Sequence, residues 1–336
     1  MVELRRDGLE FSFPDVHPDA RLRVELQRTL RIPDDGESYP LPPGLGTFPM
    51  RHVDDFGELV PEAWVRHGGV MLPMYQSEAL WIRFVSPDGY PFAVKVATGK
   101  VNAVTGEDWS DGLHRDPQDY LTVPEQPWLD GYAVEEGTIR QFVAMPLGAG
   151  YSVEEQMTGA AEHGGIQLVV HPLKAAVWKR MQRKRPFHVS DGIEAFSAAP
   201  APALSMDMGL APGGRMTQHI YDDERPFEEW DTRQRSRCFV HLANALVWQA
   251  ITGQHPPYPP LTAEAYTRAG FPWFEYYDAD RKALRGATRF RSLKSVLELG
   301  KQKGEVPLPE NTTTDPGNVV RIDARGSGFE VREGRF

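Results

Sequence analysis

Cysteine is almost absent from this chain, because Cys238 is the only one among its 336 residues. A single thiol excludes an intrachain disulfide and a zinc site built from cysteine ligands. Cys238 stands beside Phe239 and Val240 in an apparent strand, where a thiol is usually buried and unreactive. The sequence therefore indicates neither a disulfide framework nor a cysteine nucleophile.

Long apolar runs are also missing. No segment approaches the roughly 20 apolar residues that a membrane helix needs. The first residues, MVELRRDGLEFSF, lack the apolar stretch of a secretion signal. We therefore expect a cytoplasmic protein with no membrane partner.

Positive charge is in the minority, with 37 Lys and Arg against 47 Asp and Glu and a formal net charge of −10. An acidic surface repels phosphate backbones and anionic lipids, which disfavours a nucleic-acid partner. The sequence has one basic run, formed by Lys179, Arg180, Arg183, Lys184 and Arg185. This run could bind a phosphate or an acidic partner, but a solvated helix face or loop is the simpler explanation.

The motifs of common enzymes are absent as well. Gly99-Lys100 is followed by Val101, and no glycine precedes it at the spacing of a phosphate-binding loop. Ser152 lacks the second glycine of a nucleophile elbow, and neither a complete dinucleotide motif nor a His-Glu-x-x-His pair occurs. The motifs therefore assign no cofactor and do not decide whether the protein is an enzyme.

The chain does contain a series of alternating segments, which are divided by many of its 31 Gly and 29 Pro residues. In Arg21–Ile32 most apolar residues share one parity and most charged residues the other, as in a strand with one buried face. The same alternation recurs at Tyr90–Ala97, Thr138–Met145, Ile166–His171 and Arg215–Tyr221.

These segments predict an α+β fold that is predominantly antiparallel sheet, sandwich-like or barrel-like. Short turns such as Ser86–Gly89 can join only antiparallel strands. Pro212-Gly213-Gly214 predicts a further turn, between strands Ala203–Met208 and Arg215–Tyr221. Helices are expected mainly in the C-terminal third, over Leu242–Ile251, after Thr262 and over Ser292–Leu299.

No convincing linker divides the chain. We expect residues 1–306 to form one compact β-rich unit, or two tightly packed lobes that divide near 195–205. Residues 307–336 are polar and are expected to be a C-terminal extension, with an edge strand at Val319–Ile322.

Histidines near carboxylates form the first candidate site. His219 lies in an alternating segment, and Asp222 and Asp223, either of which could supply the carboxylate, follow it closely. Together with His171 or His241 from another strand, these residues could form a His/carboxylate metal site. His219, Asp222 and His241 are the candidate catalytic residues, although a solvated strand face and turn would give the same pattern.

Polar residues inside apolar strands form the second candidate site. Lys95, Gln141 and Gln167 each interrupt an apolar segment, and a buried polar side chain must find a partner. The three could line a pocket for a polar ligand at the mouth of a sandwich or barrel. A half-exposed sheet with ordinary polar positions is the simpler explanation.

Aromatic residues in the C-terminal third form the third candidate site. Phe271–Tyr277 is too apolar to leave in water, so it either completes the core or contacts a protein partner or a second copy of the chain. The partner-binding candidates are Tyr258, Trp273 and Tyr276. The leading hypothesis is a non-catalytic binding or assembly protein that uses this aromatic, Pro-rich surface. The rival is a metal-assisted or acid/base hydrolase acting on a small polar or sugar-like substrate.

Overall fold

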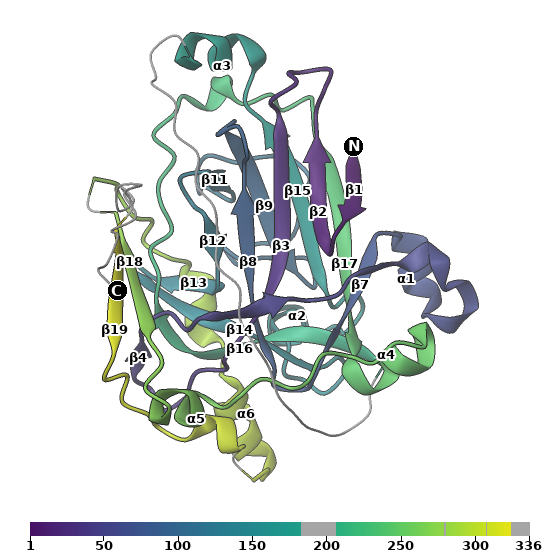
Figure 1. Ribbon diagram of the computed structural model, residues 1–336, viewed down its shortest axis with the longest axis vertical. Helices are drawn as coiled ribbons and strands as arrows, with labels where there is room; N and C mark the ends of the chain where they lie inside the picture. The colour runs from purple at the N-terminus through teal and green to yellow at the C-terminus, as the bar shows by residue number, and fades with distance from the viewer. Residues whose placement is uncertain (183–205, 279, 307, 324–336) are drawn as a thin grey trace, which may run out of the picture.

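The computed structural model describes residues 1–182, 206–278, 280–306 and 308–323 (Figure 1). Within these residues, strands β1 to β17 belong to one hydrogen-bonded sheet, which folds over itself into two facing layers. Most strand pairs are antiparallel, and the helices of the C-terminal half flank the sheet. The predicted α+β class is confirmed.

The front layer in Figure 1 contains an antiparallel meander that starts with the N-terminal strands of the chain. Its main strands are β1 (Val2–Arg5), β2 (Gly8–Ser12), β3 (Arg21–Thr29), β8 (Ala79–Val85), β13 (Gly131–Glu135), β14 (Thr138–Pro146) and β16 (Asp207–Thr217). Three short strands pair with β16, β3 and β8 respectively: β4 (Ser38–Tyr39), β5 (Gly44–Thr47) and β12 (Trp128–Leu129).

The back layer has β15 at its centre, antiparallel to β9 on one side and to β17 on the other. Its strands are β6 (Arg51–His52), β7 (Val70–Met74), β9 (Phe92–Thr98), β10 (Val101–Asn102), β11 (Leu121–Val123), β15 (Ile166–Pro172) and β17 (Ser236–Asn244). The β17–β7 pair is parallel. The helices are α1 (Glu62–His67), α2 (Val153–Thr158), α3 (Ala175–Gln182), α4 (Ala245–Thr252), α5 (Ala263–Arg268) and α6 (Val296–Lys303).

The main core lies between the two layers. Val24 and Leu26 of β3 belong to the same buried cluster as Val94 of β9 and Leu168 of β15. Alternation places these side chains on the inner face of each strand, because successive residues of a strand point to opposite sides. Each large apolar side chain buried in this way contributes about 1.5–3 kcal/mol.

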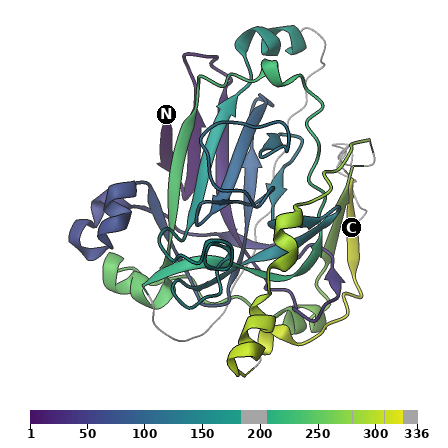
Figure 2. The same cartoon turned by 180° about the vertical axis from the view of Figure 1, so that it is seen from behind.

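Strand β9 is buried on both of its faces, although only one of them meets the core. Val94 and Val96 point into the core, and Lys95 points to the opposite side of the sheet. That side is covered by the loop 103–120, which Figure 2 shows lying over the back layer. The candidate site described below forms between β9 and this loop.

The predicted turn at Pro212-Gly213-Gly214 is wrong, because β16 runs without a break from Asp207 to Thr217. A Cβ atom on Gly213 would lie 2.5 Å from Val143 Cγ2, and one on Gly214 would lie 2.2 Å from the Pro33 carbonyl oxygen. These glycines therefore permit close packing of neighbouring chain segments rather than a reversal. Ala203–Ser205 lies outside the described residues.

Two predicted helices begin later than expected, and in each case a capping residue explains the start. Asn244 Oδ1 accepts a hydrogen bond from the Leu246 amide at 3.0 Å, so β17 extends through Asn244 before α4 begins. Ser295 forms a capping box with Glu298, which places the start of α6 at Val296. No helix in the described part of the chain is long and apolar enough to cross a membrane.

The C-terminal residues return to the body of the protein as a strand. β19 (Val319–Asp323) pairs in parallel with β18 (Trp273–Tyr277), and Phe274 of β18 also bonds the backbone of Leu41. β19 thus lies at an edge, where the sequence predicts an edge strand. The expected lobe boundary near 195–205 falls outside the described residues.

Candidate functional site

The structure keeps His171 and His241 apart. They lie in the paired strands β15 and β17, in which Ile166 is opposite Val240. His171 is therefore about six residues, or roughly 20 Å, from His241 along the strands. His171 Nε2 lies 3.3 Å from the Asp111 carbonyl oxygen, whereas His241 Nε2 lies 3.1 Å from that of Gly68.

His219 and Asp222 lie beyond the end of β16, in a third neighbourhood. His219 packs against the β13–β14 turn, where a Cβ atom on Gly137 would lie 2.7 Å from its Cε1 atom. The Asp222 amide donates to the Lys282 carbonyl oxygen at 2.8 Å. Among the residues that the structure describes, no three His, Cys, Asp or Glu side chains are arranged to hold a metal ion.

Gln141 and Gln167 are buried, and the backbone provides partners for both amides. Gln141 accepts a bond from the Ile32 amide at 3.0 Å and donates to the Leu30 carbonyl oxygen at 2.8 Å. Gln167 accepts from the Lys100 amide at 2.7 Å and donates to the Gly164 carbonyl oxygen at 3.0 Å. These glutamines hold chain segments together through their backbone partners.

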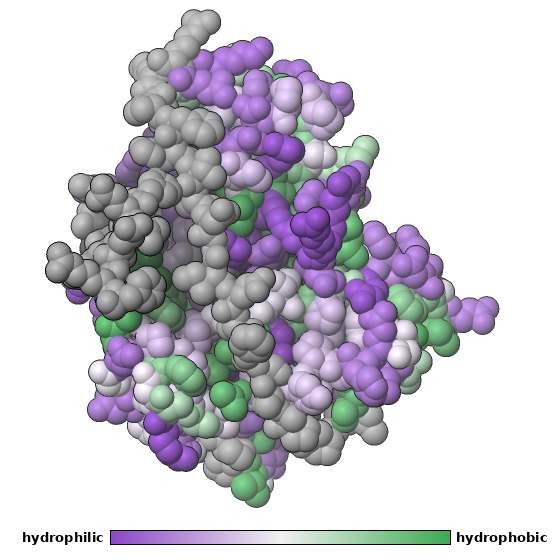
Figure 3. Space-filling model, viewed as in Figure 1, coloured by the Kyte–Doolittle hydropathy of each residue, from purple (hydrophilic) through white to green (hydrophobic). Residues whose placement is uncertain are grey.

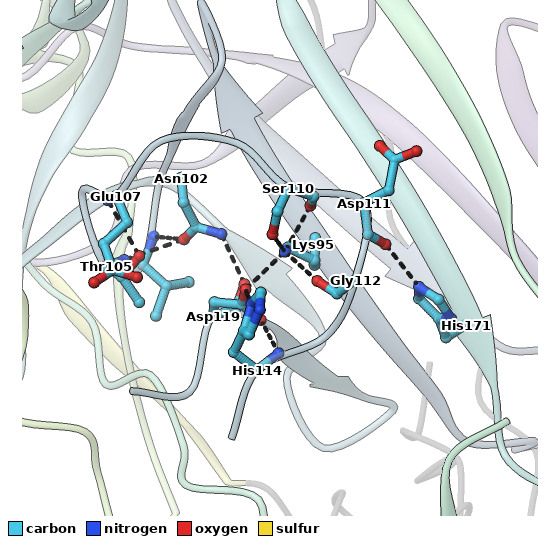
Figure 4. A network of polar contacts seen from close by, with 11 residues as sticks. Lys95, Asn102, Thr105, Glu107, Ser110, Asp111, Gly112, His114, Asp119 and His171 are labelled. Carbon is cyan, nitrogen blue, oxygen red and sulfur yellow. Dashed lines mark hydrogen bonds and ion pairs between the residues drawn. The ribbon is translucent and has the colours of Figure 1, made fainter. Parts of the chain in front are cut away.

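Among the sequence candidates, Lys95 lies beside the cavity that we describe as the candidate site. Its side chain is 1% exposed, and its Nζ atom lies between β9 and the loop (Figure 4). The ammonium donates to the Ser110 carbonyl oxygen at 2.7 Å, the Gly112 carbonyl oxygen at 2.5 Å and Asp119 Oδ2 at 2.6 Å. Every N–H of the buried ammonium group therefore has an acceptor.

The residue between Ser110 and Gly112 fastens the loop to two further strands. Asp111 forms an ion pair of 2.8 Å with Arg237 of β17, and its carbonyl oxygen is the partner of His171 on β15. The strand register explains this arrangement, because Lys95, Val169 and Arg237 lie side by side across the sheet. Three consecutive loop residues thus contact three adjacent strands.

Asp119 joins this anchor to a histidine. Its carboxylate accepts the Lys95 bond, the His114 amide at 2.9 Å and His114 Nδ1 at 2.7 Å. A carboxylate only accepts hydrogen bonds, so the imidazole hydrogen lies on Nδ1 and Nε2 is left as the acceptor of the neutral ring. The Asp119 side chain is 6% exposed and the His114 side chain 56% exposed, so a buried carboxylate orients an accessible imidazole.

The far end of the loop is held by a second buried carboxylate, Asp223. It accepts hydrogen bonds from Tyr120 Oη at 2.7 Å and Trp230 Nε1 at 2.8 Å, and it lies 3.1 Å from Arg115. The Asp223 amide in turn donates to Gln118 at 2.8 Å. Asp223 is therefore a structural anchor, which holds the loop over Arg115–Tyr120, whereas the three strands hold it at Ser110–Gly112.

A cavity of about 330 Å³ opens beside His114, and we call it the Asp119 pocket. Its lining residues are Asn102, Thr105, Glu107, Asp108, Ser110, His114, Asp116, Pro117 and Asp119. Glu107, Asp108 and Asp116 are exposed, and none of them takes part in an ion pair within the described residues. Lys95 is enclosed behind Asp119 and is not part of the lining. Four of the lining residues are Asp or Glu, so the wall of the pocket carries negative charge.

A larger cavity, of about 450 Å³, lies among Arg5, Arg6, Glu10 and Arg23 on the outer face of β1 to β3. Figure 3 shows strongly hydrophilic side chains over these strands. The Arg23 guanidinium already bonds the carbonyl oxygens of Arg5 and Arg6 and lies 3.2 Å from Glu10. Its donors are thus used within the protein, so we regard the smaller Asp119 pocket as the candidate site.

The three aromatic candidates lie in different environments. Trp273 is fully buried and donates to Thr267 Oγ1 at 3.1 Å, and the partly buried Tyr276 ring lies 4.8 Å from the Trp128 ring. Tyr258 is 66% exposed, and Phe271 is half exposed. Among the three candidates, only Tyr258 is freely available to a partner.

The sequence pattern found Lys95 but missed His114 and Asp119. The available signal was a lysine within an apolar strand together with the acidic, Gly-containing segment Glu107–Asp119 downstream. No protein-family model matches this chain, and comparisons with curated proteins and with solved structures found no significant match.

Proposed function

We propose that the protein binds a small organic cation in the Asp119 pocket. The observation that carries the proposal is the His114–Asp119 pair, which presents an oriented imidazole acceptor to a cavity of about 330 Å³. A cavity of this size is at the lower end of the range for small-molecule sites. The acidic wall favours a ligand with positive charge, since opposite charges attract most strongly where water is partly excluded.

Several features favour an organic cation over a bare metal ion. Glu107, Asp108 and Asp116 all line the cavity, yet no three His, Cys, Asp or Glu side chains in the described residues form a group that could hold a metal ion. Thr105 and Ser110 add hydroxyl groups to the lining. Carboxylates and hydroxyls suit a molecule that carries several N–H donors.

The rigid loop also supports a binding role. A site that is already ordered loses little conformational entropy when its ligand binds. Lys95, Asp111 and Asp223 fix the loop to β9, β17 and the segment after β16, and none of these contacts needs the ligand.

Calorimetric titration with putrescine and with butane-1,4-diol tests this proposal, because the two probes have similar length and differ in charge. We expect putrescine to bind and the diol not to bind. The double variant Glu107→Gln/Asp108→Asn should weaken putrescine binding by about tenfold or more. Asp54→Asn, which removes an exposed carboxylate outside the pocket lining, should leave putrescine binding unchanged. Equal binding of both probes, or unchanged binding by the double variant, would contradict the proposal.

Acid–base hydrolysis in the same pocket is the second candidate function. His219, Asp222 and His241 lie apart, but His114 with Asp119 has the arrangement of an oriented general base. In such a reaction Nε2 would take a proton from a water molecule attacking a small ester and return it to the leaving group. Loss of p-nitrophenyl acetate hydrolysis in His114→Gln, with an unchanged unfolding midpoint, would support this function.

The protein-binding hypothesis remains a separate proposal, now restricted to Tyr258 and Phe271. Their exposed rings support it, and a protein partner or a second copy of the chain is the proposed occupant. Sedimentation of the wild type and of Tyr258→Ser/Phe271→Ser would reveal self-association. We also propose a cytoplasmic location, which the scarcity of cysteine supports, and no nucleic-acid partner, which the net charge supports.

A further inference from the structure

Arg31 is a buried arginine whose hydrogen bonds are incomplete. The residue is 1% exposed, and its Nη2 atom donates to Asn311 Oδ1 at 2.9 Å. The Nε and Nη1 atoms are equally buried and have no hydrogen-bond partner within the described residues. A guanidinium has five N–H groups, so most of the donors of this charged side chain are unused.

Arg28, three residues earlier, shows how the same fold satisfies a buried arginine. Its Nε and Nη2 atoms both donate to Glu78 Oε1, at 2.8 and 2.6 Å, and Nη2 also donates to the Tyr258 carbonyl oxygen. Glu78 is itself buried, so the two side chains form a buried ion pair of 2.6 Å. Arg31 has no such pair, since none of the ion pairs within 4.0 Å in the described chain includes it.

The charges near Arg31 stop short of contact. Glu310 and Asp34 are the carboxylates whose charge acts on it, yet Glu310 Oε2 is buried without a hydrogen-bond partner in the described part of the chain. Asp34 instead accepts the Leu297 amide at 3.0 Å. A buried guanidinium without a contacting anion is costly, because the charge has lost its hydration and gained no full replacement.

The segment that bonds to the Arg31 guanidinium comprises residues 308–323, and we call it the C-terminal strap. Asn311 bonds Arg31, the Asn318 carbonyl oxygen accepts from the Trp273 amide at 2.8 Å, and Asn318 Nδ2 donates to the Gly270 carbonyl oxygen at 3.1 Å. β19 completes the strap at the sheet edge, with Val319 and Val320 exposed. The strap thus contacts Arg31 and the cluster around Trp273, not the main core between the two layers, and a segment at the edge of a fold can open locally.

We propose that Arg31 is the receptor of an oxyanion-binding site that the C-terminal strap covers in the ligand-free protein. Asn311 occupies one donor in place of the ligand. When the strap opens, Nη2 becomes free beside Nε and Nη1. A carboxylate or phosphate group can then form two parallel N–H···O bonds with the guanidinium, which a neutral amide oxygen cannot match. Binding of the anion therefore displaces the strap, and this site is independent of the Asp119 pocket.

Hydrogen–deuterium exchange of residues 308–323 in the full chain tests the proposal. Exchange is measured with inorganic phosphate, with acetate, and with sodium chloride at the same ionic strength. We expect phosphate or acetate to speed exchange in the strap by about fivefold or more, saturably, as a typical coupling between sites would. An effect of phosphate alone identifies a phosphate ligand, and an effect of acetate a carboxylate ligand. No effect, or an equal effect of chloride, overturns the proposal.

Two variants separate the role of Arg31 from general loosening. Arg31→Met should abolish the anion effect, whereas Arg28→Met, which removes a buried arginine that forms an ion pair with Glu78, should retain it. Because either change can unfold the chain, Asn311→Ala is the second test. It keeps Arg31 and removes its strap partner, so the anion concentration needed for half of the effect should fall. An unchanged or higher concentration would count against the site.

Discussion

Lys95 and Asp119 form an ion pair of 2.6 Å that is enclosed between β9 and the loop 103–120. The same carboxylate holds His114 at 2.7 Å on its other side. Asp119 thereby connects the buried ammonium group of Lys95 to the accessible imidazole of His114. This relationship makes the stability of the back layer and the geometry of the pocket depend on each other.

Replacing Lys95 should destabilise the protein strongly. Lys95→Met leaves the Asp119 carboxylate buried without its counter-ion, and breaking a buried pair in this way costs about 3–5 kcal/mol. Lys95→Met/Asp119→Asn should recover part of that loss, because no unpaired charge remains. Urea unfolding of both variants measures the difference, and Lys179→Met, at an exposed helix position, is the control. A loss no larger than that of the control would show that the pair is not stabilising.

His241 should make the protein less stable in acid. Burial lowers the pKa of this histidine from 6.5 to about 3, so the unfolded chain binds a proton that the folded protein excludes. The stability that His241 contributes is present above pH 6.5 and is lost as the pH falls toward 3, by up to about 1.4 kcal/mol per pH unit. His241→Gln keeps a donor for the Gly68 carbonyl oxygen and removes the titration. Chemical unfolding between pH 4 and 7 should show the gap between variant and wild type narrowing toward acid.

Asp130 should have the opposite pH dependence. Burial raises its pKa from 3.8 to about 7, and its carboxyl group bonds Gln218 Nε2 at 2.6 Å. The folded protein therefore holds a proton that the unfolded chain releases, and stability falls as the pH rises from about 4 to 7. Asp130→Asn is expected to gain on the wild type across this interval and to keep a constant advantage above it. Thermal unfolding in a pH series would reject this assignment if the two curves stayed parallel.

Gly214 should not tolerate a side chain. A Cβ atom at this position would lie 2.2 Å from the backbone oxygen of Pro33, which cannot rotate away. Gly214→Ala should therefore cost about 1–3 kcal/mol, as overpacking of a well-filled core does. Gly317→Ala is the matched control, because nothing in the described structure lies within 4 Å of its Cβ position. Denaturation midpoints for the two variants provide the measurement.

The sequence predicted the strands well, because their pattern is local. In β3 the alternation of apolar and charged residues alone identifies the buried face, and the structure buries Leu22, Val24 and Leu26 there. The same reasoning failed at Gly213-Gly214. Glycine permits both a turn and close packing, and only the position of Pro33 decides between them.

The site was less accessible to sequence reasoning, because its contacts join distant strands. His171 and His241 have suitable chemistry, but the β15–β17 register places them at opposite ends of the pair. Lys95 was identified as a polar residue within an apolar strand, whereas its partner Asp119 lies 24 residues away on a loop. Nothing in the local pattern of that loop indicates which strand it crosses.

The fastening of Ser110, Asp111 and Gly112 to three neighbouring strands has a consequence for protein engineering. Lys95, His171 and Arg237 come from β9, β15 and β17, and each contacts one stretch of the loop. Grafting the loop onto another sheet would therefore transfer its shape only if these three side chains were transplanted with it. The transferable module is a discontinuous set of residues, so recombination at any single crossover within 95–237 would divide it.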